Sequence, residues 1–335
     1  MSSASSAPSS ARRTTAARTP DFFIVGSPKT GTTSLYEMLR RHPQIYMPEL
    51  KEPGFLASEW RPPAGFETKT RELKFPKTLE QYLALFDDAE PQQLAGEAST
   101  MYLWSRSAAQ NIAELQPDAR IVAILREPAS FLRSLHLNFL RGRNEDERDL
   151  RKAIALETDR REGRRIPASA WRPQTLQYSE HVRYVEQLRR YHARFPRERV
   201  LVLIYDDFRS DNAAMVRHVL RFLDVDERRP LAAVELNVTS DTVRSWQLKR
   251  LLQQVSTGRG PGAAIAKNAI KAVTTTRLRR GALSTIHERV VLAEPPAPDE
   301  SFMLELRRRY KPEVVALSEY LDRDLVSQWG YDRIV

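Results

Sequence analysis

One short segment near the start of the chain limits the folds that the sequence can adopt. Phe22–Val25 is an apolar run of strand length, and Gly26 ends it. The residues from Gly26 to Gly31 make a glycine-bounded loop, and an amphipathic helical pattern begins at Thr32. A buried strand, a tight loop and a helix are the opening of a βα unit.

Later patterns extend this unit into an α/β fold. Apolar runs predict further strands at 94–97, 121–125 and 200–205, and residues 44–47 are expected to be extended. Helical patterns cover residues 106–115, 128–140, 175–195, 213–223, 242–255 and 301–321. Alternating strands and helices predict a central parallel sheet with helices on both faces. The near-neutral charged stretch 142–165 is expected to be a surface excursion.

Composition sets the domain organisation. The 335 residues are 41% hydrophobic and 29% charged, as in an ordinary globular protein. We expect a disordered Ser/Ala/Arg tail over 1–20 and a single domain over 21–335. The absence of cysteine excludes a disulfide framework, a Cys nucleophile and a thiolate metal site. No apolar run approaches the roughly 20 residues of a membrane helix, and residues 1–20 lack the apolar core of a secretory signal, so we expect a cytoplasmic protein.

Positive charge is concentrated in one stretch. The net charge is +10, and residues 244–281 hold nine Lys or Arg and no Asp or Glu. Such a block attracts phosphate, sulfate, anionic lipid or nucleic acid, although it can also be a solvated basic face.

The loop Gly26-Ser27-Pro28-Lys29-Thr30-Gly31-Thr32-Thr33 has the features of an anion site. Its backbone N–H groups and the helix dipole converge on one spot, Lys29 adds a full charge, and Thr32 and Thr33 add hydroxyl donors. The two glycines have the Walker A spacing, but position 32 is Thr and the lysine lies inside the loop. The strand 121–125 ends in Arg126 instead of a Walker B carboxylate, so we expect no metal.

A second anion motif follows the strand 121–125. Arg126 lies at its carboxyl end, where open α/β sheets bind ligands, and Pro128 suits the first turn of a helix. Ser134 lies two turns into that helix. An Arg and a Ser in this arrangement can hold a second phosphate.

These two motifs resemble those of sulfotransferases that use 3′-phosphoadenosine 5′-phosphosulfate (PAPS). Gly26–Thr33 resembles the family's 5′-phosphosulfate loop, and Arg126 to Ser134 resembles its 3′-phosphate motif. Weaker matches are Lys51-Glu52-Pro53, Gly96-Glu97-Ala98-Ser99, Tyr178, Tyr205-Asp206-Asp207-Phe208, and Tyr320-Leu321-Asp322-Arg323-Asp324-Leu325 with Trp329. The resemblance covers residues 21–330 and is nearest to the bacterial branch related to heparan-type sulfotransferases.

The resemblance implies a P-loop, nucleoside-kinase-like sulfotransferase fold, with PAPS as donor, adenosine 3′,5′-bisphosphate (PAP) as product and no metal. It implies that donor binding uses Gly26, Ser27, Pro28, Lys29, Thr30, Gly31, Thr32, Thr33, Arg126 and Ser134. The chain departs from the family pattern at Ala98, Ser130, Phe131 and Asp206.

Two residues are candidates for the chemistry. Lys29 would stabilise the negative charge that grows on the leaving phosphate. Glu52 resembles the general base of the heparan-like branch, and a buried Glu would have a raised pKa that suits this role. The alternatives are a structural Lys51–Glu52 pair, or His136 as the base. Glu97 could hold Lys29 or an acceptor, and His181 is expected on a helix surface.

The predicted function is sulfonyl transfer to a hydroxyl or amine of a small-molecule, glycan or lipid acceptor. The acceptor itself and the oligomeric state stay open, because variable loops, here 54–80 and 142–175, build the acceptor pocket. One alternative is a nucleoside or nucleotide kinase. The other is a basic module that binds nucleic acid or an anionic membrane through 244–281, and of these two partners nucleic acid is the less favoured.

Overall fold

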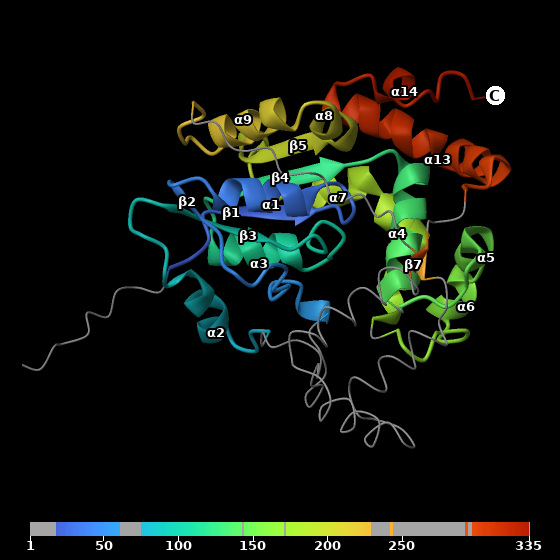
Figure 1. Cartoon of the computed structure of the whole chain (residues 1–335), viewed down its shortest axis with the longest axis horizontal. Coiled ribbons are helices and arrows are strands. Elements are labelled where there is room, and N and C mark those ends of the chain that lie inside the picture. Colours follow the sequence, from blue (N-terminus) through green and yellow to red (C-terminus); the bar gives the residue numbers. More distant parts are fainter. Residues whose placement is uncertain are drawn as a thin grey trace, which may run out of the picture.

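A five-stranded parallel sheet forms the centre of the protein (Figure 1). The computed structural model describes residues 18–60, 75–142, 144–170, 172–228, 242–243, 292–293 and 297–334. The sheet has the order β2-β3-β1-β4-β5 and consists of β1 (Phe22–Gly26), β2 (Ile45–Tyr46), β3 (Leu94–Ala98), β4 (Arg120–Leu125) and β5 (Val200–Ile204). All neighbouring strands in it run parallel. The predicted α/β class and the strands at 22–25, 94–97, 121–125 and 200–205 are therefore confirmed.

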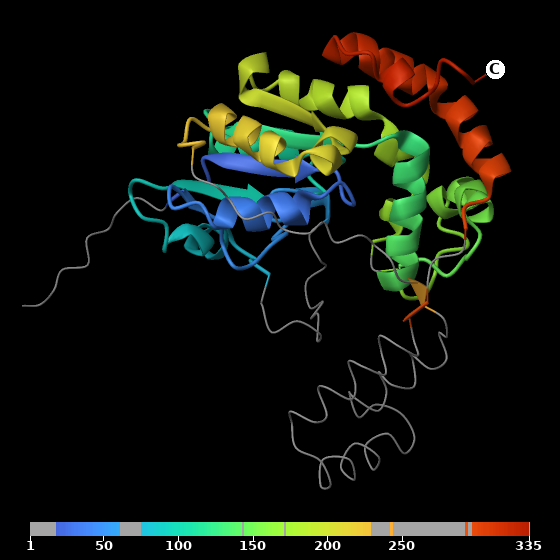
Figure 2. The same ribbon diagram turned by 45° about the horizontal axis from the view of Figure 1, so that its top comes forward.

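Helices lie on both faces of this sheet (Figures 1 and 2). The α-helices are α1 (Thr32–Arg40), α2 (Leu79–Leu83), α3 (Ala108–Leu115), α4 (Pro128–Gly142), α5 (Leu150–Ala155), α6 (Glu157–Arg161), α7 (Tyr184–His192), α8 (Tyr205–Ser210), α9 (Asn212–Phe222), α13 (Glu300–Leu321) and α14 (Leu325–Gln328). Short 3₁₀ turns are η1 (Ser58–Trp60), η2 (Ala84–Phe86), η3 (Pro173–Leu176), η4 (Tyr178–Val182) and η5 (Arg197–Arg199). A separate antiparallel pair consists of β6 (Thr242–Val243) and β7 (Leu292–Ala293).

Alternation along the strands divides the core into two clusters. Phe22 and Ile24 of β1 pack with α1 and α9, whereas Phe23 and Val25 face the cluster that includes α3, α4, α7 and α13. Successive strand side chains point to opposite faces, so one continuous apolar run fills both layers. The carboxyl ends of β1, β3 and β4 are thereby held at one edge of the sheet.

Three predictions of local structure are corrected. The stretch 142–165 is no mere surface excursion, because α5 and α6 enclose a fully buried ion pair, Arg160–Glu145, at 2.7 Å. The pattern at 242–255 begins with strand β6 instead of a helix, and the rest of it lies outside the described residues. The predicted helix 175–195 divides into η3, η4 and α7.

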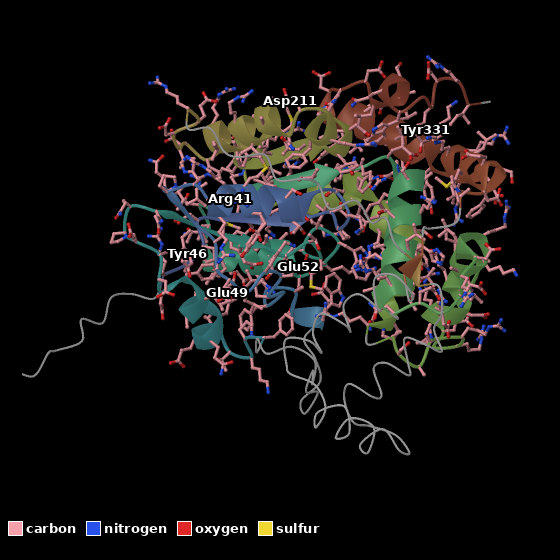
Figure 3. All side chains as sticks on the ribbon, in the orientation of Figure 1. Arg41, Tyr46, Glu49, Glu52, Asp211 and Tyr331 are labelled. Atoms are coloured by element: carbon pink, nitrogen blue, oxygen red, sulfur yellow. The ribbon has the colours of Figure 1, made fainter. Side chains whose placement is uncertain are left out.

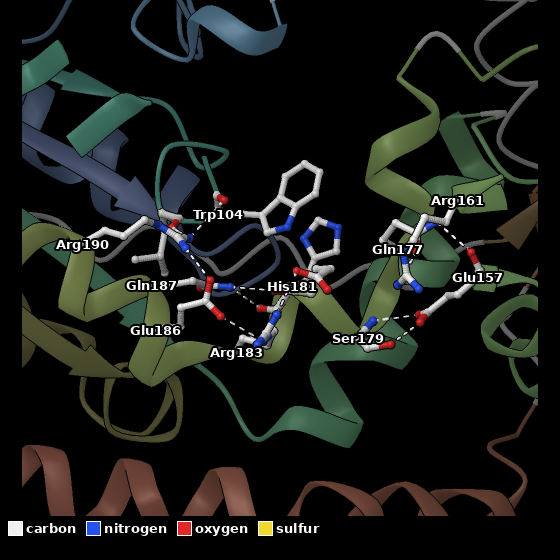
Figure 4. A network of polar contacts seen from close by, with 12 residues as sticks. Trp104, Glu157, Arg161, Gln177, Ser179, His181, Arg183, Glu186, Gln187 and Arg190 are labelled. Atoms are coloured by element: carbon white, nitrogen blue, oxygen red, sulfur yellow. Dashed lines mark hydrogen bonds and ion pairs between the residues drawn. The ribbon is translucent and has the colours of Figure 1, made fainter. Parts of the chain in front are cut away.

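A side chain explains the break in that helix. Gln187 Nε2 donates to the carbonyls of Glu180 (2.9 Å) and His181 (3.2 Å), which a continuous helix would use for its own backbone (Figure 4). His181 is consequently buried instead of lying on a helix surface, and its ring stacks on Trp104 at 4.4 Å between ring centroids. Burial lowers the pKa of His181 to about 4, so this imidazole is neutral near pH 7.

The described residues also bear on the predictions about membrane helices and the N-terminal tail. Within the described part of the chain, no helix is both long enough and apolar enough to cross a bilayer. Residues 1–17 of the expected tail and the basic block 244–281 lie outside the described residues. The described chain begins at Arg18, whose guanidinium donates to Asp21 and to the Gln93 carbonyl.

Candidate functional site

The anion loop is fixed between β1 and α1 by its own backbone. Ser27 N donates to the Ile124 carbonyl of β4 (2.8 Å), and Thr30 Oγ1 donates to the Ser27 carbonyl (2.7 Å). Gly31, at the N-cap of α1, has φ 83°, which glycine adopts without steric cost. Gly26 is close to its neighbours, since a Cβ there would lie 2.7 Å from the Cβ of Leu103.

This geometry distributes the predicted loop residues between core and surface. The loop contains four buried residues, Gly26, Ser27, Thr30 and Thr32. It also contains three half-buried residues, Pro28, Lys29 and Gly31, and the exposed Thr33. The loop therefore leaves the lysine and the start of α1 accessible to a ligand while its base is packed.

Lys29 lies in a positive environment. Its pKa is lowered by burial and by the nearby charges of Arg141 and Arg126, and only Glu52 opposes this effect. Three cations that act on one loop make an arrangement that a bound anion would stabilise. Lys29 also has φ 64°, so the loop backbone is held in a conformation that is uncommon for a non-glycine residue.

Arg126 connects the two predicted anion motifs. It directly follows β4, and its Nη1 donates to the Lys29 carbonyl at 3.2 Å, although the two residues are 97 positions apart. Its guanidinium lies 4.7 Å from the centroid of the Tyr205 ring, and its own carbonyl accepts from the Tyr184 hydroxyl (2.8 Å). The guanidinium is thus oriented toward the loop before any ligand arrives.

The helix after Arg126 is capped by a buried carboxylate. Glu127 accepts from the backbone N–H groups of Ala129 (3.0 Å) and Ser130 (2.7 Å), and the Tyr331 hydroxyl also donates to it. The C-terminal segment that carries Tyr331 therefore supports the start of α4 (Figure 3). Ser134 is half-buried, two turns farther along this helix.

Arg141 is the cation at this site that the sequence interpretation missed. It lies on α4, seven residues after Ser134, and seven residues is close to two helical turns. That spacing was the available signal, because it places both side chains on the same side of the helix.

Glu52 differs from the buried base that was expected. Its side chain is 44% exposed, and its carboxylate pairs with Lys51 Nζ at 2.6 Å. The structural alternative, a Lys51–Glu52 pair, is therefore present. The carboxylate is still part of the site electrostatically, since its charge acts on the pKa values of Lys29, Glu97 and Arg172.

Glu97 is the buried carboxyl group of the site. It lies near the carboxyl end of β3 and is fully buried, and the hydroxyls of Tyr82 and Tyr102 each donate to its Oε2 at 2.8 Å. Burial raises its pKa from 4.5 to about 7, and the hydrogen bonds from Ser99 and the two tyrosines oppose that rise only in part.

His136 lies on α4, and its side chain contacts the segment that follows this helix. Its ring is buried, its Nε2 contacts the Glu147 carbonyl at 2.9 Å, and its edge meets the ring of Tyr178. Burial lowers the pKa of this imidazole. His136 therefore packs against the segment after α4.

Comparison with known proteins identifies the family. A sequence model described as "Sulfotransferase family" matches residues 20–229. The chain is 30% identical over 155 residues to carbohydrate sulfotransferase 15 of Homo sapiens. This alignment covers 36% of this chain and 27% of that protein. It is 28% identical over 229 residues to bifunctional heparan sulfate N-deacetylase/N-sulfotransferase 4 of Mus musculus, which covers 64% of this chain and 23% of that protein. The matches thus span about a quarter of the length of these curated relatives.

A solved structure agrees with this assignment. The crystal structure of a sulfotransferase from Alicyclobacillus acidocaldarius is similar with a TM-score of 0.62 and 25% sequence identity, over 92% of this chain and 98% of that one. Because the family model matches more than half of the sequence, the chain belongs to the sulfotransferase family.

Proposed function

We propose that the protein transfers a sulfonyl group from PAPS to a hydroxyl or amine, with release of PAP. The observation that carries this proposal is the hydrogen bond from Arg126 to the Lys29 carbonyl, which joins two basic motifs from distant parts of the chain. A donor with phosphate groups at both its 3′ and 5′ positions is a ligand that two adjacent anion motifs would suit. Membership of the sulfotransferase family supports the same reaction class.

The chain's own residues divide the work in this proposal. The 5′-phosphosulfate would lie on the loop Gly26–Thr33, and Arg126 with Ser134 would bind the 3′-phosphate. The acceptor oxygen or nitrogen forms a bond to sulfur while the bond from sulfur to the bridging phosphate oxygen breaks. Glu52 takes the acceptor's proton, and Lys29 stabilises the charge on the departing oxygen.

The acceptor class that we propose is a glycan. Its support is the similarity to a carbohydrate sulfotransferase and to a heparan sulfate N-deacetylase/N-sulfotransferase. A small molecule or a lipid would be the alternative. We further propose that residues 21–335 act as one unit, since Phe302, Leu306 and Trp329 pack into the same core cluster as Phe23 and Val25. The cytoplasmic location, the tail and the membrane contact of 244–281 stay predictions.

Donor binding tests the reaction class. We expect calorimetry to detect PAP binding in the presence of a chelator, and Lys29→Ala to weaken it. The control ligand is ATP with Mg²⁺, because a kinase would prefer it. Tighter binding of ATP, or a strict requirement of PAP for Mg²⁺, would favour the kinase alternative.

Glu52→Gln tests the general base. The change keeps the side-chain shape and removes the base, so single-turnover transfer should fall by about 10²–10⁴ while PAP affinity stays nearly constant. Glu49→Gln is the matched control, because Glu49 is another exposed carboxylate three residues away (Figure 3). A Glu52→Gln enzyme that transfers at the wild-type rate would remove Glu52 from the mechanism.

A further inference from the structure

Hydrogen bonds join residues 52–56, the loop that carries Glu52, to the end of β3 and to the turn after it. Alternate backbone N–H groups of residues 52–56 donate to β3 or to the turn after it: Glu52 to the Ala98 carbonyl (3.0 Å), Gly54 to Ser99 Oγ (2.9 Å) and Leu56 to the Tyr102 hydroxyl (3.1 Å). Two of the three acceptors are side-chain hydroxyls. The position of the loop therefore depends on how these hydroxyls are themselves oriented.

The loop backbone needs this support. Glu52 has φ 59° and Gly54 has φ 64°. A left-handed conformation is uncommon for a residue with a Cβ, and it persists where the surrounding structure enforces it. Without its hydrogen bonds the loop would gain conformations in which the Glu52 carboxylate points elsewhere.

Glu97 lies directly behind the Tyr102 hydroxyl. Tyr102 donates its proton to Glu97 Oε2 at 2.8 Å, whereas Glu97 Oε1 has no hydrogen-bond partner among the described residues. In its ionised form Glu97 only accepts, so it turns the Tyr102 hydroxyl proton toward itself and leaves a lone pair of that hydroxyl free for the Leu56 N–H. Hydrogen bonds in such a chain polarise and strengthen one another.

We infer that Glu97 is a positioning residue for sulfonyl transfer, which holds the Glu52 loop through Tyr102. This inference rests on the proposed function, in which Glu52 is the general base. It gives a role to a fully buried carboxyl group that the proposed chemistry does not otherwise use. It also explains how an exposed carboxylate can be held where its charge acts on Lys29.

Tyr82 offers a matched control within the same network. Its hydroxyl donates to the same oxygen of Glu97 at the same 2.8 Å, and it is also fully buried. Its contact with the loop is made by the ring, which stacks on Phe55 at 4.9 Å between centroids. Tyr82→Phe therefore removes a donor to Glu97 and keeps the ring contact, whereas Tyr102→Phe also removes the acceptor for Leu56 N–H.

Hydrogen–deuterium exchange of the intact protein tests the inference without an acceptor. Loss of one hydrogen bond should speed exchange at Leu56 by roughly threefold to tenfold in Tyr102→Phe. Tyr82→Phe should exchange at the wild-type rate in this segment. Ser99→Ala provides a second variant, with faster exchange expected at Gly54. Equal exchange in Tyr82→Phe and Tyr102→Phe would overturn the inference.

Single-turnover transfer rates test whether the position of the loop matters for the reaction. The probe is chemically desulfated heparan sulfate with isotopically labelled PAPS in single-turnover reactions, and PAP affinity is measured alongside. Tyr102→Phe should transfer roughly tenfold more slowly with unchanged PAP affinity, because the base is misplaced and the donor site is intact. Wild-type transfer by a Tyr102→Phe enzyme whose loop exchanges faster would refute the positioning role.

The two arms separate this inference from the proposed function. If the wild-type protein bound PAP but transferred nothing to this probe, the glycan acceptor would be wrong. The exchange rates would then still decide whether Tyr102 and Ser99 hold the loop. If the protein did not bind PAP at all, the proposed function would fail, and Glu97 would lose its catalytic purpose with it.

Discussion

The buried carboxyl of Glu97 makes stability depend on pH in a way that can be calculated. Its pKa is about 7 in the folded protein and 4.5 without burial. The folded protein therefore keeps a proton between these values that the unfolded chain has lost, so this group's contribution to stability falls as pH rises from about 4.5 to 7. At about 1.4 kcal/mol for each pH unit, the loss reaches about 3 kcal/mol above pH 7.

Glu97→Gln removes this titration and keeps the side-chain shape. The free energy of unfolding should be measured by urea titration between pH 4.5 and 8 for both proteins. We expect the difference, variant minus wild type, to move in the variant's favour by about 3 kcal/mol across that range. Glu49→Gln, in an exposed position, should give a difference that hardly changes. A constant difference for Glu97→Gln would refute the reasoning, because it would mean that Glu97 ionises at its ordinary pKa.

Three further outcomes are expected. Arg126→Ala should weaken PAP by roughly 10- to 100-fold and adenosine 5′-phosphate far less in calorimetry, because a charge-assisted hydrogen bond is worth about 1.5–3 kcal/mol; equal losses would show that it does not bind the 3′-phosphate. Arg160→Met should cost about 3–5 kcal/mol in urea titrations, since Glu145 would keep an unpaired buried charge, and adding Glu145→Met should recover part of it. PAP affinity should fall as pH rises through the lowered pKa of Lys29, and Lys29→Arg should move that fall to higher pH.

Features encoded by neighbouring residues could be predicted from the sequence. The apolar run before Gly26 and the spacing of Gly26 and Gly31 indicated the strand, the loop and the helix that the structure contains. The same holds for Arg126 at the end of β4, since a parallel strand buried on both faces has a recognisable apolar pattern. The roles of these residues in donor binding stay predictions until the variants are measured.

Features that depend on contacts between distant segments could not be predicted. Charge averaging over 142–165 concealed that Glu145 and Arg160 leave the surface together as a pair. The break before α7 depends on which carbonyls accept hydrogen bonds from the Gln187 side-chain amide, and a helical pattern does not indicate these acceptors. Glu52 is exposed on a loop with left-handed backbone conformations at residues 52 and 54, which hydrophobic periodicity does not report.

The hydrogen bond between Arg126 and Lys29 also affects how the protein folds. The anion loop looks like a local motif, yet its contacts to Ile124 and Arg126 come from a strand almost one hundred residues later. Pairing of parallel strands over such separations is intrinsically slow, because the chain must close a long segment before any contact rewards it. In refolding experiments, nucleotide binding should therefore return with the slowest phase of sheet assembly, and a peptide of β1, the loop and α1 should not bind PAP.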